Sequence, residues 1–228
     1  MSNFEYSGRD NLDIMSLAVN YNSSIYKWLS HDTKIGSSVL DFGSGQGEFY
    51  YRFNSYCDNV YAVEPDVNMH NLFPSNYIFS KIESLDNKKF DLIYSVNVLE
   101  HIEDDVLAVN KFKGYLSTGK GVVKIFVPAR QELYSDMDKK VGHYRRYSKK
   151  QIKKIFVDGG YTIKSCRYFD FLGYFAAAFY KILGKSGDIN PKSLVFYDKY
   201  IFPVSLFLDK FFSRFIGKNI VIEAVLKK

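Results

Sequence analysis

A glycine-rich segment and a later acidic residue carry the strongest chemical signal in this 228-residue chain. Residues 39–49 read VLDFGSGQGEF, which places a glycine-rich turn between a short apolar run and a segment with helical character. Glycines in such a turn let a ligand approach the backbone closely. Glu64 ends the next apolar run, and from there a carboxylate can accept hydrogen bonds from both hydroxyls of a ribose. The two features predict a site for an adenosine-containing ligand.

The charges around the glycine turn indicate what else that ligand carries. Asp41 stands two residues before Gly43, and Glu48 occupies the place where dinucleotide-binding turns have Gly or Ala. A carboxylate facing a pyrophosphate has the wrong charge. The turn therefore favours a cationic group, such as a sulfonium amino acid, over phosphates.

Two histidines are candidates for proton transfer. His101 lies just after Asn97, where the carboxyl edge of a sheet is expected, and His143 belongs to the segment GHYRRYS. Arg145 and Arg146 can bind an anion, and their positive charge favours the neutral, basic form of a nearby imidazole. We expect His143 to act as the base or as an acceptor ligand, with His101 as the next candidate.

The rest of this segment offers supporting roles. Tyr147, together with the two arginines, is a candidate for substrate binding, and Asp136 could assist by orienting His143, as could Asp138. The alternative is that the segment only anchors the helix that begins after Ser148. No metal is expected, because the nearby carboxylates resemble a helix start rather than a converging cluster with a histidine; they are Glu100, Glu103, Asp104 and Asp105.

Short apolar runs that alternate with helix-length segments must position these groups. This alternation predicts an α/β fold with a doubly wound parallel sheet and helices on both faces. Ser148 and Gln151 form a capping-box pattern at the start of one such helix. The predicted strands occupy residues 38–43, 59–64, 77–81, 90–96, 121–129, 161–169 and 219–228.

We expect one domain over residues 1–228. It comprises an N-terminal helical segment (1–37), a core (38–170), an aromatic helical insertion (171–218) and a last strand (219–228). In the insertion, Val204, Phe207 and Phe211 recur at helical spacing opposite Asp209 and Lys210, which predicts an amphipathic helix. Its apolar side could be core, lid or membrane contact.

Composition and charge limit the remaining classes. With 46% hydrophobic and 25% charged residues the chain is globular, and 19 Tyr and 20 Phe make it unusually aromatic. Residues 1–110 hold 7 basic and 16 acidic residues, whereas residues 111–228 hold 24 and 9, so an anionic partner is favoured by the second part. Two distant cysteines, no signal peptide and no spanning segment indicate a reducing cytoplasm.

The glycine loop together with FDLIYSVNVLEHIEDD (residues 90–105) resembles the class I S-adenosylmethionine-dependent methyltransferases. The resemblance implies a Rossmann-like, seven-stranded sheet whose last strand is antiparallel, and S-adenosylmethionine as the cofactor. It also implies that the ribose binds Glu64 and that Asn97 lies near the sulfonium. The methionine end would contact Asp41, Gly43, Ser44 and Gly45, and the adenine edge Ile82 and Glu83.

Further segments resemble a bacterial subgroup associated with glycosyltransferases and surface-polysaccharide biosynthesis. They include residues 127–148, YFDFLG from Tyr168, and the C-terminal IGKNIVIEAVLKK. This resemblance implies O-methylation of a small or lipid-linked anionic glycan, with peripheral contact to the inner membrane face. The alternatives are a methyltransferase for lipid-quinone precursors and a nucleic-acid methyltransferase or binder. No base-flipping motif supports the nucleic-acid alternative.

Overall fold

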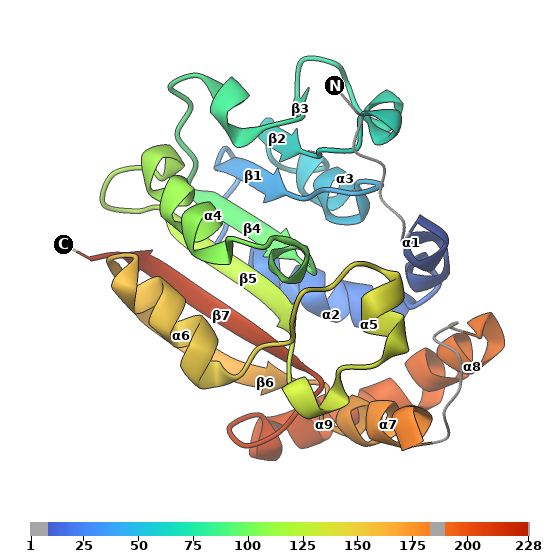
Figure 1. The fold of residues 1–228 in the computed structure, drawn as a ribbon. Coiled ribbons are helices and arrows are strands. Elements are labelled where there is room, and N and C mark those ends of the chain that lie inside the picture. The colour runs from blue at the N-terminus through green and yellow to red at the C-terminus, as the bar shows by residue number, and fades with distance from the viewer. Residues whose placement is uncertain (1–8, 183–189, 228) are drawn as a thin grey trace.

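The computed structural model describes residues 9–182 and 190–227, which build one seven-stranded sheet between two layers of helices (Figure 1). The strand order is β3-β2-β1-β4-β5-β7-β6, and β7 alone runs antiparallel to its neighbours β5 and β6. This confirms the predicted fold class. The strands are β1 Ser38–Phe42, β2 Asn59–Val63, β3 Ile78–Phe79, β4 Leu92–Val96, β5 Val122–Pro128, β6 Tyr161–Phe169 and β7 Asn219–Leu226.

Each face of the sheet has its own apolar core. Under α4 and α6, Phe112 and Phe156 pack on strand residues such as Ile93. On the other face, under α2 and α3, Ile25 and Phe53 pack on a second set of strand residues. The helices are α1 Arg9–Ser16, α2 Val19–Ser30, α3 Glu48–Asn54, α4 Asp105–Phe112, α5 Asp136–Lys140, α6 Lys149–Asp158, α7 Phe171–Ile182, α8 Pro191–Phe196 and α9 Phe202–Phe212.

Local sequence signals set several of these boundaries. Asp104 caps α4 by accepting a hydrogen bond from the amide of Leu107, at 2.8 Å. The capping box at α6 forms as the sequence predicts, with Ser148 and Gln151 satisfying each other's backbone amides. In addition, none of the described helices has the length and apolar character to cross a bilayer.

The connection between β6 and β7 holds α7, α8 and α9, which form a layer beside the sheet (Figure 1). In α9 the buried side chains are Phe202, Ser205 and Asp209, while Phe207 and Phe211 are 56% and 62% exposed. The amphipathic pattern is thus present, but its aromatic side faces outward and its acidic residue faces inward.

Buried carboxylates explain this orientation. Asp209 accepts hydrogen bonds from the amides of Asp170 and Phe171, which start α7, at 2.8 and 2.9 Å. Asp170 adopts a left-handed φ of 65° and accepts hydrogen bonds from Ser205 and Tyr197. A buried carboxylate needs such donors to remain charged without a large free-energy penalty. The polar contacts therefore fix which side of α9 faces the protein.

Candidate active site

The glycine loop lies at the carboxyl end of β1, where the strand order reverses between β1 and β4. Gly43 has a left-handed φ of 81°, and a Cβ placed there would lie 2.3 Å from a methyl group of Val98. Only glycine fits this position. Above the loop, Gln46 donates a hydrogen bond to Asp13 of α1 at 2.7 Å. The helix α1 therefore covers the loop, which the sequence does not indicate.

Three polar side chains of the predicted cofactor site lie at this loop, all buried. Glu64 accepts hydrogen bonds from the amides of Gly45 and Asp66, each at 2.9 Å, so its carboxylate is held against the loop. Burial raises the pKa of Glu64, while those two amides act in the opposite direction. Ser44 Oγ is buried and has no hydrogen-bond partner among the described residues.

Asp41 has the most perturbed environment in the loop. Burial raises its pKa to about 8, and the nearby charge of Glu64 contributes in the same direction. The buried carboxyl of Asp41 requires a proton or a cationic ligand. The buried hydroxyl of Ser44 requires a hydrogen-bond partner. These residues fit the cationic methionine end of S-adenosylmethionine, with Glu64 suited to the ribose.

The predicted adenine contacts are less clearly arranged. Ile82 is buried in the turn after β3, but the carboxylate of Glu83 pairs with Lys111 of α4 at 2.5 Å. That hydrogen bond lowers the pKa of Glu83. At the end of β4, Asn97 adopts a left-handed φ of 53° and donates its amide to Phe126. Its backbone therefore turns sharply at the sheet edge where the sulfonium is expected.

His143 is the best-oriented histidine at the same edge. Its Nδ1 lies 2.7 Å from Oδ1 of Asp138, and Nε of Arg146 lies 2.8 Å from the same oxygen. Burial acts to raise the pKa of Asp138, but His143 and Arg146 outweigh it and bring that pKa down to about 2. An ionised carboxylate only accepts hydrogen bonds, so Nδ1 of His143 carries the proton and Nε2 is the basic nitrogen.

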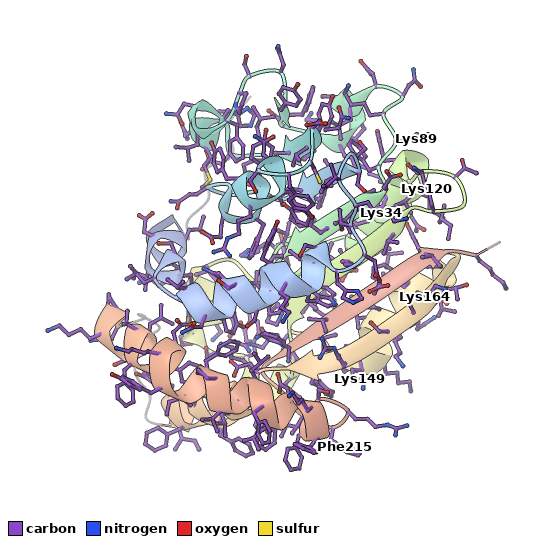
Figure 2. All side chains as sticks on the ribbon, turned by 180° about the vertical axis from the view of Figure 1, so that it is seen from behind. Lys34, Lys89, Lys120, Lys149, Lys164 and Phe215 are labelled. Carbon is purple, nitrogen blue, oxygen red and sulfur yellow. The ribbon has the colours of Figure 1, made fainter. Side chains whose placement is uncertain are left out.

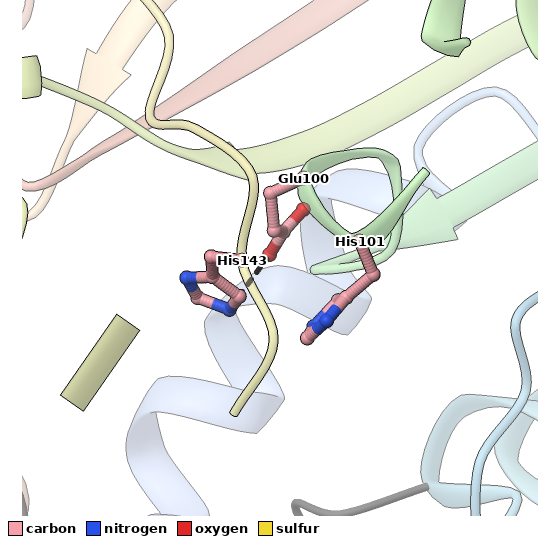
Figure 3. Close-up of side chains that lie close together, drawn as sticks. All are labelled: Glu100, His101 and His143. Carbon is pink, nitrogen blue, oxygen red and sulfur yellow. Dashed lines mark ion pairs between the residues drawn. The ribbon is translucent and has the colours of Figure 1, made fainter. Parts of the chain in front are cut away.

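His101 and Glu100 face this imidazole from the short helical turn η3, Leu99–His101 (Figure 3). The rings of His101 and His143 meet edge to face with centroids 4.5 Å apart. Oε1 of Glu100 lies 3.8 Å from Nε2 of His143. Burial lowers the pKa of His101 to about 4, helped by His143, and burial raises the pKa of Glu100 to about 8.

The other predicted substrate residues have protein partners. Arg145 pairs with Asp105 at 2.8 Å, so the two adjacent guanidinium groups bind different carboxylates. Tyr147 is buried and donates to the same Asp105 at 2.7 Å. These contacts join the segment to α4, whereas the alternative left open by the sequence concerned the helix that begins after Ser148, which is α6. The exposed Asp136 pairs with Lys139, and it is Asp138 that orients His143.

Glu100 is a site residue that the sequence does not indicate, and Asp138 was only the second candidate for orienting His143. Glu100 was assigned to a helix start, although it lies one residue before His101 and is fully buried. Asp138 had less support than Asp136, yet it forms the capping box of α5 with Ser135 as well as the contact to His143. The available signal was the S-x-x-D spacing, which assigns Asp138 an inward role at the helix start.

Comparison with known proteins agrees with this geometry. Residues 19–165, more than half of the chain, match the family model described as a methyltransferase domain. The chain therefore belongs to this methyltransferase family. Among curated proteins, none matches the chain in sequence. The subgroup linked to surface polysaccharides remains a prediction, because the match identifies only the broader family.

Solved structures share the fold at low sequence identity. Coclaurine N-methyltransferase bound to N-methylheliamine and SAH has a TM-score of 0.61 and 13% identity, over 90% of this chain and 70% of that one. An S-adenosylmethionine-dependent methyltransferase from Archaeoglobus fulgidus has a TM-score of 0.55 and 15% identity, over 89% and 93%. Phosphoethanolamine N-methyltransferase 2 of Haemonchus contortus, in complex with S-adenosyl-L-methionine, has a TM-score of 0.58 and 16% identity. The match covers 92% of this chain and 53% of that one.

Proposed function

We propose that the chain transfers the methyl group of S-adenosylmethionine to a hydroxyl group of a small or lipid-linked anionic glycan. The observation that carries the transfer step is the placement of two half-sites at one sheet edge. The loop after β1 with Glu64 forms one half, and His143 held by Asp138 forms the other. The glycan class rests on the resemblance described above.

The residues that would hold the cofactor are Asp41, Ser44, Gly45 and Glu64. When bound, S-adenosylmethionine supplies a methyl group on a positively charged sulfur. The buried Asp41 offers a negative charge for the cationic end, and Glu64 offers carboxylate oxygens already oriented by backbone amides. Such preorientation lowers the entropy cost of binding.

A hydroxyl acceptor must lose its proton as it becomes methylated. Nε2 of His143 can accept that proton, because Nδ1 is fixed as a donor to Asp138. The ionised Asp138 then stabilises the imidazolium, as the carboxylate of a catalytic triad does. Arg146 positions Asp138 from its other side and keeps it ionised. In this role Arg146 acts through Asp138.

We expect Glu64→Ala to weaken the binding of S-adenosylmethionine by about 1.5 to 3 kcal/mol, because hydrogen bonds to a charged group are lost. Isothermal titration calorimetry measures this change directly. Glu132→Ala is the matched control, since that exposed carboxylate pairs with Arg130 outside the glycine loop, and it should bind the cofactor as the wild type does. Equal affinity of Glu64→Ala and wild type would remove Glu64 from the cofactor site.

An exposed aromatic surface supports a lipid-linked acceptor. We define the α7–α9 patch by large apolar side chains that are each at least 38% exposed, and Phe215 at its end points away from the protein (Figure 2). Lys192 of α8, Lys210 of α9 and Lys199 between these two helices lie in the same segment. The patch residues are Phe175, Phe179, Tyr180, Ile182, Val195, Phe196, Tyr200, Val204, Leu206, Phe207, Phe211, Phe212 and Phe215.

Aromatic side chains interspersed with lysines are typical of a surface that lies in the headgroup region of a membrane. Large exposed apolar patches mark surfaces that bind a protein or a membrane. The positive charges complement anionic lipids. We therefore propose peripheral binding of this patch to an anionic membrane, which would bring a lipid-linked acceptor to the enzyme.

We expect the protein to cosediment with phosphatidylglycerol vesicles at low salt and much less with phosphatidylcholine vesicles. Phe211→Asp should weaken this binding by about 10-fold or more, since burying a Phe is worth about 1.5 to 3 kcal/mol. Val157→Asp on α6 is the control, because Val157 is 58% exposed outside the patch. Failure of the wild type to bind these vesicles would contradict the proposed membrane contact. A dimer that Phe211→Asp dissociates would instead indicate that the patch binds a second copy of the chain.

The acceptor class is tested with methyl-labelled S-adenosylmethionine and membrane extracts of the cells that encode the protein. The proposal predicts label in the organic phase that moves into water after mild acid hydrolysis of glycosyl phosphates. Label that stays in the organic phase would indicate a lipid-quinone precursor. Label released by ribonuclease would indicate a nucleic acid. Either of these two results would overturn the glycan assignment.

A further inference from the structure

Three groups from two segments far apart in the sequence converge beside the acceptor edge. Glu100 and His101 come from η3, and His143 comes from the loop between α5 and α6. One ligand atom from each of the three lies within 4.8 Å of the others, and Figure 3 shows the carboxylate of Glu100 directed toward His143 with the ring of His101 beside them. Two imidazoles and one carboxylate are a common donor set for divalent transition metals.

The carboxylate of Glu100 is the second observation. The residue is 0% exposed, and neither of its oxygens has a hydrogen-bond partner within the described part of the chain. Nε2 of His143, which carries no proton when Nδ1 donates to Asp138, lies 3.8 Å from Oε1 of Glu100, beyond hydrogen-bond distance. A buried carboxylate without donors is costly, and a cation between Glu100 and the histidines would satisfy it.

The outer contacts of the two histidines match those of metal ligands. A ligating histidine usually donates its other ring nitrogen to a carboxylate or a backbone carbonyl, which fixes the tautomer. Nδ1 of His143 lies 2.7 Å from Asp138, so Nε2 is directed toward Glu100. The ring of His101 is hydrogen-bonded by the backbone of Val141 and Gly142. Both rings are therefore already oriented.

We propose that Glu100, His101 and His143 bind one divalent transition-metal cation, of the Zn²⁺ and Mn²⁺ class. The expectation that no metal binds rested on the lack of a histidine near these carboxylates, and the fold supplies two. Three protein ligands leave at least one coordination position for an exchangeable oxygen. Cation binding itself does not depend on the proposed function; occupation of that position by an acceptor hydroxyl does.

Metal binding also assigns a second role to His143. With the cation present, Nε2 is a ligand, and the acceptor hydroxyl loses its proton while bound to the metal, to water or buffer. The methyl carbon then bonds to that oxygen, and the electron pair of the broken C–S bond stays on sulfur. If the cation is bound during turnover, methyl transfer requires the metal. If the site is empty, His143 itself accepts the proton and methyl transfer does not require the metal.

The test uses the full chain, stripped with EDTA and titrated with ZnCl₂, MnCl₂ and MgCl₂ by calorimetry. We expect one site per chain with affinity falling from Zn²⁺ through Mn²⁺ to Mg²⁺. Glu100→Gln and His101→Asn should each weaken Zn²⁺ binding by about 10-fold or more, and Asp138→Asn by about 10- to 100-fold. His31→Asn is the control, because His31 is exposed and pairs with Asp32.

Circular dichroism keeps this test decisive if a variant folds poorly. Zn²⁺ should raise the melting temperature of the wild type but not that of folded Glu100→Gln. Wild-type protein that binds no cation, or Glu100→Gln and His101→Asn that bind it as tightly as wild type, would overturn the proposal. If calorimetry shows that the wild type binds no cation and methyl transfer is unchanged in EDTA, this inference alone is overturned. Cation binding without any methyl transfer would overturn the proposed function alone.

Discussion

Replacing His143 with alanine is expected to lower kcat for methyl transfer by about 10² to 10⁴, while the dissociation constant of S-adenosylmethionine stays within about 2-fold. The imidazole is the only group at the acceptor edge, among the described residues, whose basic nitrogen is fixed by an ionised carboxylate, that of Asp138. Steady-state kinetics on the labelled acceptor and calorimetry with the cofactor measure the two quantities separately.

Matched variants define what this result means. His31→Ala removes an exposed imidazole that pairs with Asp32 and should leave kcat unchanged. Asp138→Asn keeps the size of the side chain but removes its charge, so it should lower kcat without raising the KM of the acceptor. If His143→Ala keeps the wild-type kcat, the residue has no part in the chemistry, and His101 becomes the next candidate.

The local parts of the site could be predicted because each depends on neighbours in sequence. Gly43 has a left-handed φ of 81° in the turn directly after β1, and Glu64 directly follows the adjacent strand β2. The capping box at Ser148 is likewise a three-residue relation. The order of the strands follows from their alternation with helices, since right-handed crossovers leave few arrangements.

The orientation of α9 could not be predicted in the same way. Helical periodicity shows that Phe207 and Phe211 share a side, but it does not show whether that side faces the core. The structure places Asp209 inside because the amides at the start of α7 need an acceptor. That contact joins residues that are far apart in sequence, so no local pattern reports it.

The cluster at the acceptor edge depends on tertiary structure as well. His143 meets Glu100 and His101 only because the loop after α5 returns to η3, where the amide of Tyr144 donates to the carbonyl of Glu100 at 2.8 Å. The two histidines lie 42 residues apart in the sequence, so no local pattern indicates that their rings meet. The useful signal was topological: both segments follow strands whose carboxyl ends share one edge of the sheet.

Asp41 gives rise to the other large effect. Burial raises the pKa of its carboxyl to about 8 in the folded chain, whereas in the unfolded chain the pKa is about 3.9. Between these values the folded state binds a proton that the unfolded state has released. The stability of the ligand-free protein therefore falls as pH rises from about 4 to about 8, and the full contribution is present only below pH 4.

The size of this effect follows from the difference in pKa. Four units correspond to about 5 kcal/mol at 1.36 kcal/mol per unit, and urea unfolding at pH 5 and pH 8 should show most of it. Asp41→Asn should remove the part of the dependence that belongs to Asp41 and leave the part of Glu100, whose pKa burial also raises to about 8. Asp58→Asn, at an exposed position, should leave the whole dependence unchanged. Near pH 7, binding of S-adenosylmethionine should release a proton from Asp41, because the cationic ligand favours the ionised carboxylate. Calorimetry in two buffers of different ionisation enthalpy measures that proton. A wild-type protein equally stable at both pH values would show that Asp41 is ionised in the free enzyme, and the cradle would then bind its cofactor without any exchange of protons.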